Sequence, residues 1–361
     1  MGGFGPALPL LQSDQGTSAA VAGLHGTALG IASIIAGYLN APLVHRFGRY
    51  RTSWIGLLIF NIGGLGFVIF PDPILTIPSM LIAGIGISTT INNTIAFISN
   101  HYPNHQTRAV SQNNAVNSGF GLLGTILIGI IASTAISWRL GLLISIPYAI
   151  ALYLLGGRQF KPEHIPDIEG RQRGSLPRKY WWAWLGLLFT ISAEFAIAYW
   201  AAALVKERTG IAVKERTGIA QASATALMFA YALGMVIGRW FGTYLLPNLD
   251  PDRRLQAMLM IQALGFLALW VSEITVISVL ALFVIGLGTS LQFILTTLRM
   301  LKFGAEKSDL AIGKSSLAAG IAIGASPFLL GLLADSVGIS SAFLVVPVFI
   351  ALAFIIVVLV P

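Results

Sequence analysis

Charged residues are scarce in this chain and cysteine is absent. Asp, Glu, Lys and Arg make up 10% of its 361 residues, whereas 56% are hydrophobic and the mean hydropathy is +0.81. Soluble globular domains carry about 25% charged residues, so this composition excludes a soluble fold. The lack of cysteine excludes disulfides and thiol chemistry.

Leader and catalytic motifs are missing as well. The first residues, MGGFGPALPLLQ, contain no basic leader of a cleavable signal peptide. The histidines are scattered, and neither an H-E-x-x-H zinc motif nor a phosphate-binding glycine loop occurs. We therefore expect no enzyme, no cofactor and no metal site. A net charge of +8 would suggest a nucleic-acid partner in a soluble protein. In a chain this apolar, the distribution of the charge is more informative than its sum, and we expect no nucleic-acid partner.

Long apolar runs fill most of the chain. Stretches such as WIGLLIFNIGGLGFVIF and SAFLVVPVFIALAFIIVVLV approach or exceed the ~18 apolar residues typical of a membrane-spanning helix. The alternating pattern of a membrane barrel is missing, so these runs predict an all-α polytopic membrane protein. Eleven full spans are expected, at residues 18–40, 52–70, 74–99, 107–133, 138–156, 180–204, 220–246, 254–270, 274–299, 309–334 and 340–360.

The two halves of the sequence match each other. AGIGIS at residues 83–88 corresponds to IGLGTS at 285–290, with an offset of 286 − 84 = 202 residues for the first shared glycine. GIIAST at 129–134 corresponds to GLLADS at 331–336, and 331 − 129 is again 202. A third pair, TALG ending at 30 and YALG ending at 234, has an offset of 234 − 30 = 204. A constant offset predicts two parallel copies of one helical unit.

Each copy contains six expected helices, which gives twelve in all. The copies are residues 1–156 and 180–361, joined by a polar linker at 157–179. Because a helix at 180–204 opens the second copy, its partner must open the first, and most of that partner falls before residue 1. We expect the chain to begin inside its first helix, through truncation or a misplaced start codon, and to lack roughly 15 to 20 residues.

Lys and Arg gather on one side of the predicted spans. One side carries Arg46, Arg49, Arg51, Arg108, Arg158, Lys161, Arg171, Arg173, Arg178, Lys179, Arg253, Arg254, Arg299, Lys302, Lys307 and Lys314, and the other carries Arg139, Lys206, Arg208, Lys214 and Arg216. Basic loops mark the cytoplasmic side, so the linker is expected to be cytoplasmic in a plasma or inner cell membrane.

An octapeptide is written twice in succession, as VKERTGIAVKERTGIA at residues 205–220. We expect it in a loop on the less basic side, where eight extra polar residues cost little loop entropy. A tandem DNA slip that the loop tolerates is one explanation. A role in gating is the alternative.

One loop carries a family resemblance. APLVHRFGRYR, at residues 41–51, resembles the loop signature G-x-x-x-D-R-x-G-R-R of the major facilitator superfamily, with Arg46, Gly48 and Arg49 at the expected positions. Ala41 stands for the glycine and His45 for the aspartate, which puts the usual charge contact of that aspartate in doubt. In the second half, LPNLDPDRR keeps Asp250 at the acidic position.

These loop residues, His45, Arg46, Gly48, Arg49 and Asp250, have two interpretations. They form a conformational latch if the family likeness holds. Alternatively, the arginines only follow the positive-inside rule and anchor helix ends at anionic headgroups.

The resemblance implies a secondary transporter for a small solute, working by alternating access between two bundles. It also implies that the first and fourth helices of each half line a central cavity. That places Asn92, Asn93, Glu194 and Gln292 there, with Trp200 and Phe4 as apolar walls. A monomer in the lipid bilayer is expected. A non-transporting sensor, a structural membrane protein and an inactive truncated transporter remain the alternatives.

Two full charges lie inside predicted spans, where insertion costs at least ~2.5 to 3.5 kcal/mol. Glu194 lies 13 residues past Trp181, about 20 Å into the membrane. It is our candidate for a proton-linked carboxylate, the alternative being a structural acid bonded to a neighbouring helix. Arg239 lies nearer the cytoplasmic end of its span, so we expect it to extend toward that surface rather than pair with Glu194.

Neutral polar residues complete the candidates. Asn113 and Asn117 are one turn apart on one helical face, and their amides either bind solute hydroxyls or fasten helices. His25 is either a protonation site or a packing residue. The few embedded charges favour a neutral or weakly ionic solute.

Overall fold

The computed structural model of the chain describes residues 4–102, 106–132, 134, 137–156, 175–209, 227–242, 244, 249–304 and 308–360. These residues form helices joined by short turns, with no strand in the described ranges. The helices are α1 (Phe4–Gln15), α2 (Ala19–Phe47), α3 (Arg49–Ile69), α4 (Pro73–His101), α5 (Gln106–Ala132), the 3₁₀ helix η2 (Trp138–Ile144), α6 (Ser145–Gly156), α7 (Arg178–Thr209), α10 (Phe229–Phe241), α11 (Pro251–Val271), α12 (Thr275–Thr289), α13 (Gln292–Gly304), α14 (Ser308–Val337), α15 (Ile339–Ala342) and α16 (Val345–Leu359).

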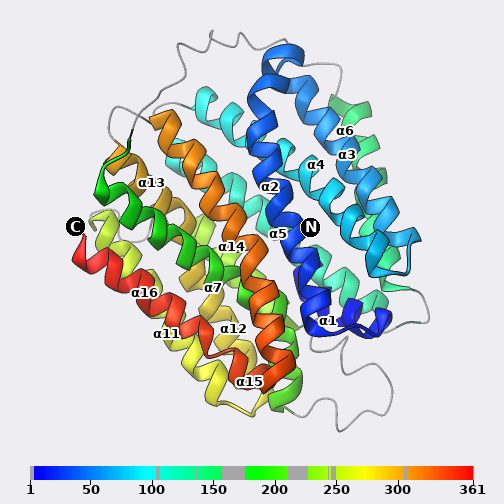
Figure 1. Cartoon of the computed structure of the whole chain (residues 1–361), viewed down its shortest axis with the longest axis vertical. Coiled ribbons are helices and arrows are strands. Elements are labelled where there is room, and N and C mark those ends of the chain that lie inside the picture. The colour runs from blue at the N-terminus through cyan, green and yellow to red at the C-terminus, as the bar shows by residue number, and fades with distance from the viewer. Residues whose placement is uncertain are drawn as a thin grey trace.

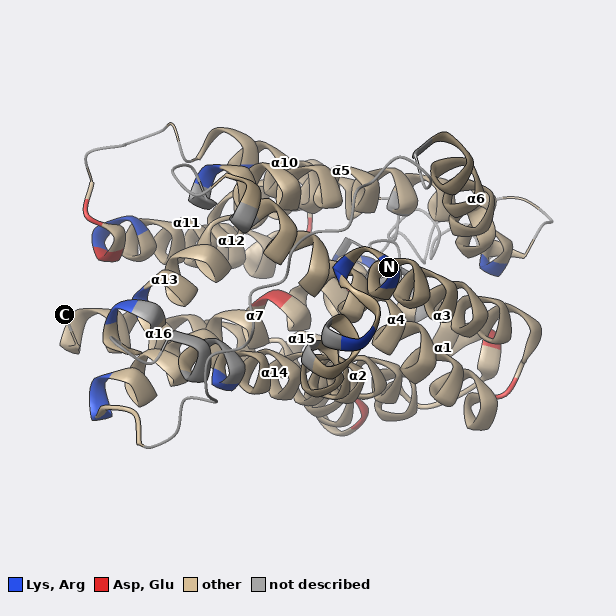
Figure 2. Ribbon diagram, turned by 90° about the horizontal axis from the view of Figure 1, so that it is seen from above, with Lys and Arg blue, Asp and Glu red and all other residues tan. Residues whose placement is uncertain are grey.

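The predicted polytopic all-α architecture is confirmed. Within the described residues, ten helical segments are long and apolar enough to cross a membrane, and α10 is a shorter apolar helix. Figure 1 shows α2, α3, α4 and α6 on the right and α7, α11, α13 and α16 on the left. Charged residues are sparse along these helices, as Figure 2 shows, so most helical surface suits a lipid environment.

Three of the predicted spans are present as membrane-length segments, but each contains a local departure from regular α-helix. The span at 274–299 breaks between α12 and α13, the span at 340–360 breaks between α15 and α16, and the span at 138–156 begins as η2. At the first break, the Ser290 N–H bonds to the carbonyl of Leu287, three residues back, and the Ser290 hydroxyl donates to the same carbonyl at 2.7 Å. This tighter turn ends the regular α-helical pattern.

The helices alternate in direction, so one end of the bundle collects most basic side chains. We call it the basic end: α2, α4, α10 and α13 finish there, and α3, α5, α7, α11 and α14 begin there. Its described basic residues are Arg46, Arg49, Arg51, Arg108, Arg178, Lys179, Arg253, Arg254, Lys302 and Lys314. The opposite end carries Arg139, Lys206 and Arg208 among the described residues.

Helices from the two halves of the chain pack directly against each other. α2 packs on α14 and α5 on α10, and both pairs lie side by side in Figure 2. α1 contacts α7. The α2–α14 contact is close at Gly30, where an added Cβ would lie 2.6 Å from the Cα of Gly324. The two halves of the chain are therefore in direct contact through α2 and α14 and through α5 and α10.

Two arginines that the charge count placed in loops are buried in helical elements, so that placement was wrong. Arg139 in η2 is 6% exposed, and its Nη2 lies 2.7 Å from a carboxylate oxygen of Asp14. Arg299 in α13 is 4% exposed, and its Nε lies 2.9 Å from Asp252 in α11. Each also donates to carbonyls at the end of a neighbouring helix, Phe70 for Arg139 and Val357 for Arg299. Ion pairing and helix capping together offset the cost of burying these charges.

Some predictions fall outside the described residues. They concern linker residues 157–174, octapeptide residues 210–220 and the side chains of Phe4 and His45. Octapeptide residues 205–209 were expected in a loop but form the last residues of α7, so that prediction was wrong for them.

Candidate functional site

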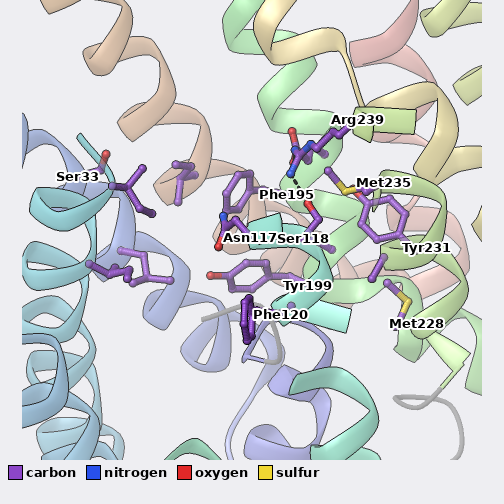
Figure 3. Close-up of a pocket in the computed structure, with 18 of the residues that line it drawn as sticks. Ser33, Asn117, Ser118, Phe120, Phe195, Tyr199, Met228, Tyr231, Met235 and Arg239 are labelled. Carbon is purple, nitrogen blue, oxygen red and sulfur yellow. Dashed lines mark hydrogen bonds and ion pairs between the residues drawn. The ribbon is translucent and has the colours of Figure 1, made fainter. Parts of the chain in front are cut away.

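A cavity of about 400 Å³ lies between the two halves, at mid-length of the long helices. One side comes from α2, α4 and α5, and the other from α7, α10 and α14 (Figure 3). Its lining residues are Leu29, Ser33, Ile87, Ser88, Ile91, Asn117, Ser118, Phe120, Gly121, Glu194, Phe195, Ala198, Tyr199, Met228, Tyr231, Ala232, Met235, Arg239 and Ile323. This volume falls in the range of small-molecule sites.

Glu194 and Arg239 meet at the edge of this cavity. Arg239 Nη2 lies 3.5 Å from Glu194 Oε1, with the arginine side chain 13% and the glutamate side chain 17% exposed. The expectation that Arg239 extends to the surface instead of pairing was therefore wrong. Counting residues from the ends of the predicted spans placed Glu194 and Arg239 at different depths in the membrane. Such counts ignore helix tilt and the reach of a long arginine side chain. An unpaired buried charge is costly, which favours the pair.

Neutral groups hold the Arg239 guanidinium in place. Its Nη1 donates to the hydroxyl of Ser118 and, at 3.5 Å, to the carbonyl of Asn114, both in α5. Its Nε donates to the carbonyl of Ser290 at 3.2 Å. The Ser111 hydroxyl in turn donates to the Arg239 carbonyl at 2.8 Å. The arginine thus joins α10 to α5 across the two halves, while Glu194 is the acidic residue among those lining the cavity.

The cavity walls differ in polarity. Aromatic rings and methionines from α7 and α10, together with Phe120 from α5, form an apolar wall, and Figure 3 shows Phe195, Tyr199 and Phe120 close together. The Phe195 and Tyr199 ring centroids are 6.0 Å apart. Serines and an amide from α2, α4 and α5 supply hydrogen-bonding groups on the other side, including Ser33 and Asn117. Such a site suits a solute with an apolar body and a polar group.

Glu194, which was predicted for the central cavity, lines it, and so does Asn117, which was a candidate either for solute binding or for fastening helices. Asn92, Asn93, Gln292 and Trp200 are not among its lining residues. Asn93 is buried and donates to Asn40 Oδ1 at 3.0 Å, and Gln292 is buried and donates to Gln262 Oε1 at 2.8 Å.

The indole of Trp200 donates to the carbonyl of Pro327 at 2.9 Å. Asn92, on α4, is half-buried. Asn93, Gln292 and Trp200 thus use polar atoms to join one helix to another.

The predicted latch residues lie at the basic end. Gly48 separates α2 from α3 with φ +79°, a conformation that favours glycine, and its N–H bonds to the carbonyl of Val44 at 2.8 Å. Arg46 lies over the ring of Phe47 at 5.3 Å, and Arg49 begins α3. Asp250 is the N-cap of α11, where its carboxylate accepts the N–H of Asp252 at 3.1 Å.

His25 is fully buried away from this cavity. Its Nδ1 lies 3.0 Å from the carbonyl of Ala22, and its Nε2 lies 2.9 Å from the hydroxyl of Thr76 in α4. These contacts are those of a residue that packs helices together.

Sequence reasoning missed the aromatic and methionine wall, although a signal for it exists. Tyr231, Met235 and Arg239 recur every four residues, which places them on one face of α10, and Met228, the N-cap residue of α10, precedes Tyr231 by three residues. The same spacing relates Phe195 to Tyr199 on α7. A search for helical faces that combine aromatic residues with one charge would have found both.

The fold and cavity together define an α-helical membrane protein of the solute-transporter type. A model of the family described as Major Facilitator Superfamily matches residues 1–303, and the chain belongs to that family. The predicted family membership is confirmed.

Three comparisons give more detail. YwtG of Bacillus subtilis (strain 168), named as a metabolite transport protein, is 28% identical over 158 residues, which cover 44% of this chain. The matched region is 34% of YwtG, so this chain corresponds to about a third of that relative's length.

Two solved structures share the fold. A variant of the E. coli fucose:proton symporter FucP has a TM-score of 0.65 at 18% identity, covering 99% of this chain and 93% of the other. A bacterial homologue of the human lysosomal transporter Spinster, solved in an inward-facing and occupied conformation, has a TM-score of 0.68 at 14% identity, covering 98% and 91%.

Proposed function

We propose that this chain is a secondary active transporter that moves a small solute by alternating access and couples it to protons through Glu194. The observation that carries the proposal is the Glu194–Arg239 pair, which lies in a cavity walled by both halves of the chain. A solute bound there would contact both halves at once. Rocking of the halves would then change which side of the membrane reaches it.

Glu194 suits a coupling role because its proton would change the charge balance of the cavity. Ionised, it neutralises Arg239, and protonated, it leaves that arginine without a charged partner among the lining residues. Proton binding and solute binding at neighbouring positions are thereby linked. FucP, which shares the fold, is named as a proton symporter.

The membrane and orientation belong to the same proposal. The basic end would face the cytoplasm, since basic loops are retained on that side, and the protein would lie in the plasma or inner cell membrane as a monomer. The linker between the halves would then be cytoplasmic. The predicted latch residues would close the basic end in one state of the cycle.

Reconstituted protein tests the proposal, with a solute identified by a thermal-shift screen of the purified chain. Glu194→Gln should abolish transport driven by a pH gradient while leaving solute counterflow intact. The matched control is Glu207→Gln, because Glu207 lies exposed near the end of the same helix and accepts a bond from the Ser340 hydroxyl at 2.7 Å. Gradient-driven transport that survives in Glu194→Gln would show that this carboxylate does not couple protons.

A further inference from the structure

The charge balance of the cavity indicates which solutes fit it. Among its lining residues, Arg239 and Glu194 are the basic and acidic side chains, and together they sum to zero charge. Arginine stays protonated in proteins, so the carboxylate is the member of this pair that a proton can neutralise. Because a proton can neutralise Glu194 but not Arg239, the net charge of the occupied site depends on whether the solute is an anion, a neutral molecule or a cation.

A cationic solute fits poorly. It could pair with Glu194 only by separating that carboxylate from Arg239, which would leave a second positive charge uncompensated in a low-dielectric site. A neutral solute would leave the pair intact, so its binding would not by itself place a proton on Glu194. An anionic solute can take the place of Glu194 beside Arg239 if Glu194 receives a proton. That exchange keeps the charge of the site at zero.

The geometry of the pair is suited to such an exchange. Charge-assisted hydrogen bonds between a guanidinium and a carboxylate are about 2.7–2.9 Å long, whereas Nη2 and Oε1 are 3.5 Å apart. The guanidinium is fixed independently of Glu194 by Ser118, Asn114 and Ser290. Arg239 would therefore keep its position when the glutamate leaves, ready for a carboxylate of the solute.

The body of the solute is indicated by the wall next to Arg239. Met235 and Tyr231 lie one and two turns from Arg239 on α10, about 6 and 12 Å along the helix axis. Phe195 and Tyr199 from α7 face the same space (Figure 3). Ring faces and thioethers favour a flat aromatic body over a polyhydroxylated one.

We infer that the cavity binds an aromatic monocarboxylate together with one proton, the solute's carboxylate replacing Glu194 at Arg239 while Glu194 becomes protonated. The inference rests on the proposed function and names its solute class. Charge balances: one anion and one proton enter a neutral site. Among the described residues that line the cavity, Arg239 is the charged group that faces Glu194 and the other titratable side chains are Tyr231 on α10 and Tyr199 on α7, while the polar groups of α5 are the neutral Asn117 and Ser118.

Calorimetry on the purified full chain tests this with four matched probes. These are 3-phenylpropionate, its amide 3-phenylpropionamide, the ring-free propionate and the cation 3-phenylpropylamine. We expect 3-phenylpropionate to bind at least about tenfold more tightly than each of the other three. Repeating the titration in buffers of different ionisation enthalpy should give about one proton taken up per molecule bound.

Substitutions test the roles of Glu194 and Arg239 separately. Glu194→Gln should still bind 3-phenylpropionate but without proton uptake, and Glu207→Gln should behave as the parent. Arg239→Gln should lose the preference for the carboxylate over the amide, and Arg239→Lys, which keeps the charge, should retain part of it. Thermal unfolding of each variant shows whether it is folded.

Two results would overturn the inference: equal binding of 3-phenylpropionate and its amide, or no binding of 3-phenylpropionate by the folded parent protein. Neither result bears on the transport proposal itself. That proposal depends on gradient-driven flux of whichever solute the screen identifies, so the two can fail separately.

Discussion

The carboxylate of Asp335, near the end of α14, caps the first turn of α2 at Ala19. Asp335 Oδ1 accepts the backbone N–H of Ala19 at 2.9 Å, and its Oδ2 accepts the next N–H, that of Ala20, at 2.8 Å. A carboxylate at a helix N-terminus satisfies free N–H groups and interacts favourably with the helix dipole. Because α2 and α14 belong to different halves, this contact joins the halves at the end opposite the basic end.

Asp335→Ala should weaken that closure. Hydrogen bonds to a charged group contribute about 1.5–3 kcal/mol each when buried, and less here because Asp335 is exposed. We expect the population open at this end to increase severalfold, measured as longer spin-label distances between cysteines placed at exposed Ser13 and Val337. The chain has no cysteine of its own, so the labels are unambiguous.

The matched control for that experiment is Ser336→Ala. In the part of the chain that the structure describes, the Ser336 hydroxyl donates to the carbonyl of Leu333 in its own helix, at 2.9 Å. Distances that are identical in the parent, Asp335→Ala and Ser336→Ala would show that the Asp335 cap does not hold the halves together.

The close approach of α2 and α14 predicts a second effect. A Cβ at position 30 would lie 2.6 Å from Gly324 Cα, which is backbone that cannot rotate away. Gly30→Ala should therefore separate the helices and cost about 1–3 kcal/mol of stability. Gly37→Ala, on the same helix, would place its Cβ 3.7 Å from Ser316 Cβ and should be tolerated. Similar melting temperatures for the two variants would contradict this account of the interface.

The buried Arg299 predicts a third effect. Asp252→Asn removes the negative charge 2.9 Å from Arg299 Nε and leaves a buried cation whose other partners among the described residues, such as the Val357 carbonyl and the Phe303 ring, are neutral. Breaking a buried pair costs about 3–5 kcal/mol, and the retained amide oxygen should reduce this to about 1–3 kcal/mol. Unfolding followed by tryptophan fluorescence measures the loss.

Asp250→Asn, two residues away, is the control for Asp252→Asn. Asn caps a helix N-terminus about as well as Asp, so this variant should retain the parent's stability within about 0.5 kcal/mol. Equal losses at positions 250 and 252 would mean that the effect comes from the loop as a whole and not from the Arg299 pair.

The sequence alone predicts the fold because the solvent is a bilayer. Apolar runs must be helices there, so most spans follow from composition: eleven were expected, and the described residues contain ten of membrane length and the shorter α10. The 202-residue offset between the halves indicates the family's architecture. The site was predicted only in part. Glu194 was found because a charge within a span is rare, and Asn117 because amides cluster beside it.

The rest of the site depends on helix rotation and tilt, which residue counting does not give. Arg239 pairs with Glu194 although its distance along the chain from the loop suggests a different depth. Asn93 and Gln292 are chemically as suitable as Asn117, but their helices turn them toward Asn40 and Gln262 instead. Polar residues within spans are thus divided between fastening helices and lining the cavity, and only packing decides which.

The most direct test of alternating access uses a single cysteine in the cavity. Ser88 lines it, and Ser88→Cys is nearly isosteric in a chain that has no other cysteine. In vesicles of known orientation, a membrane-impermeant maleimide should label position 88 when added to either side alone. Adding Asp335→Ala should speed labelling from the side of Asp335 and slow it from the basic end. Labelling from one side only, in both the parent and the Asp335 variant, would contradict the account.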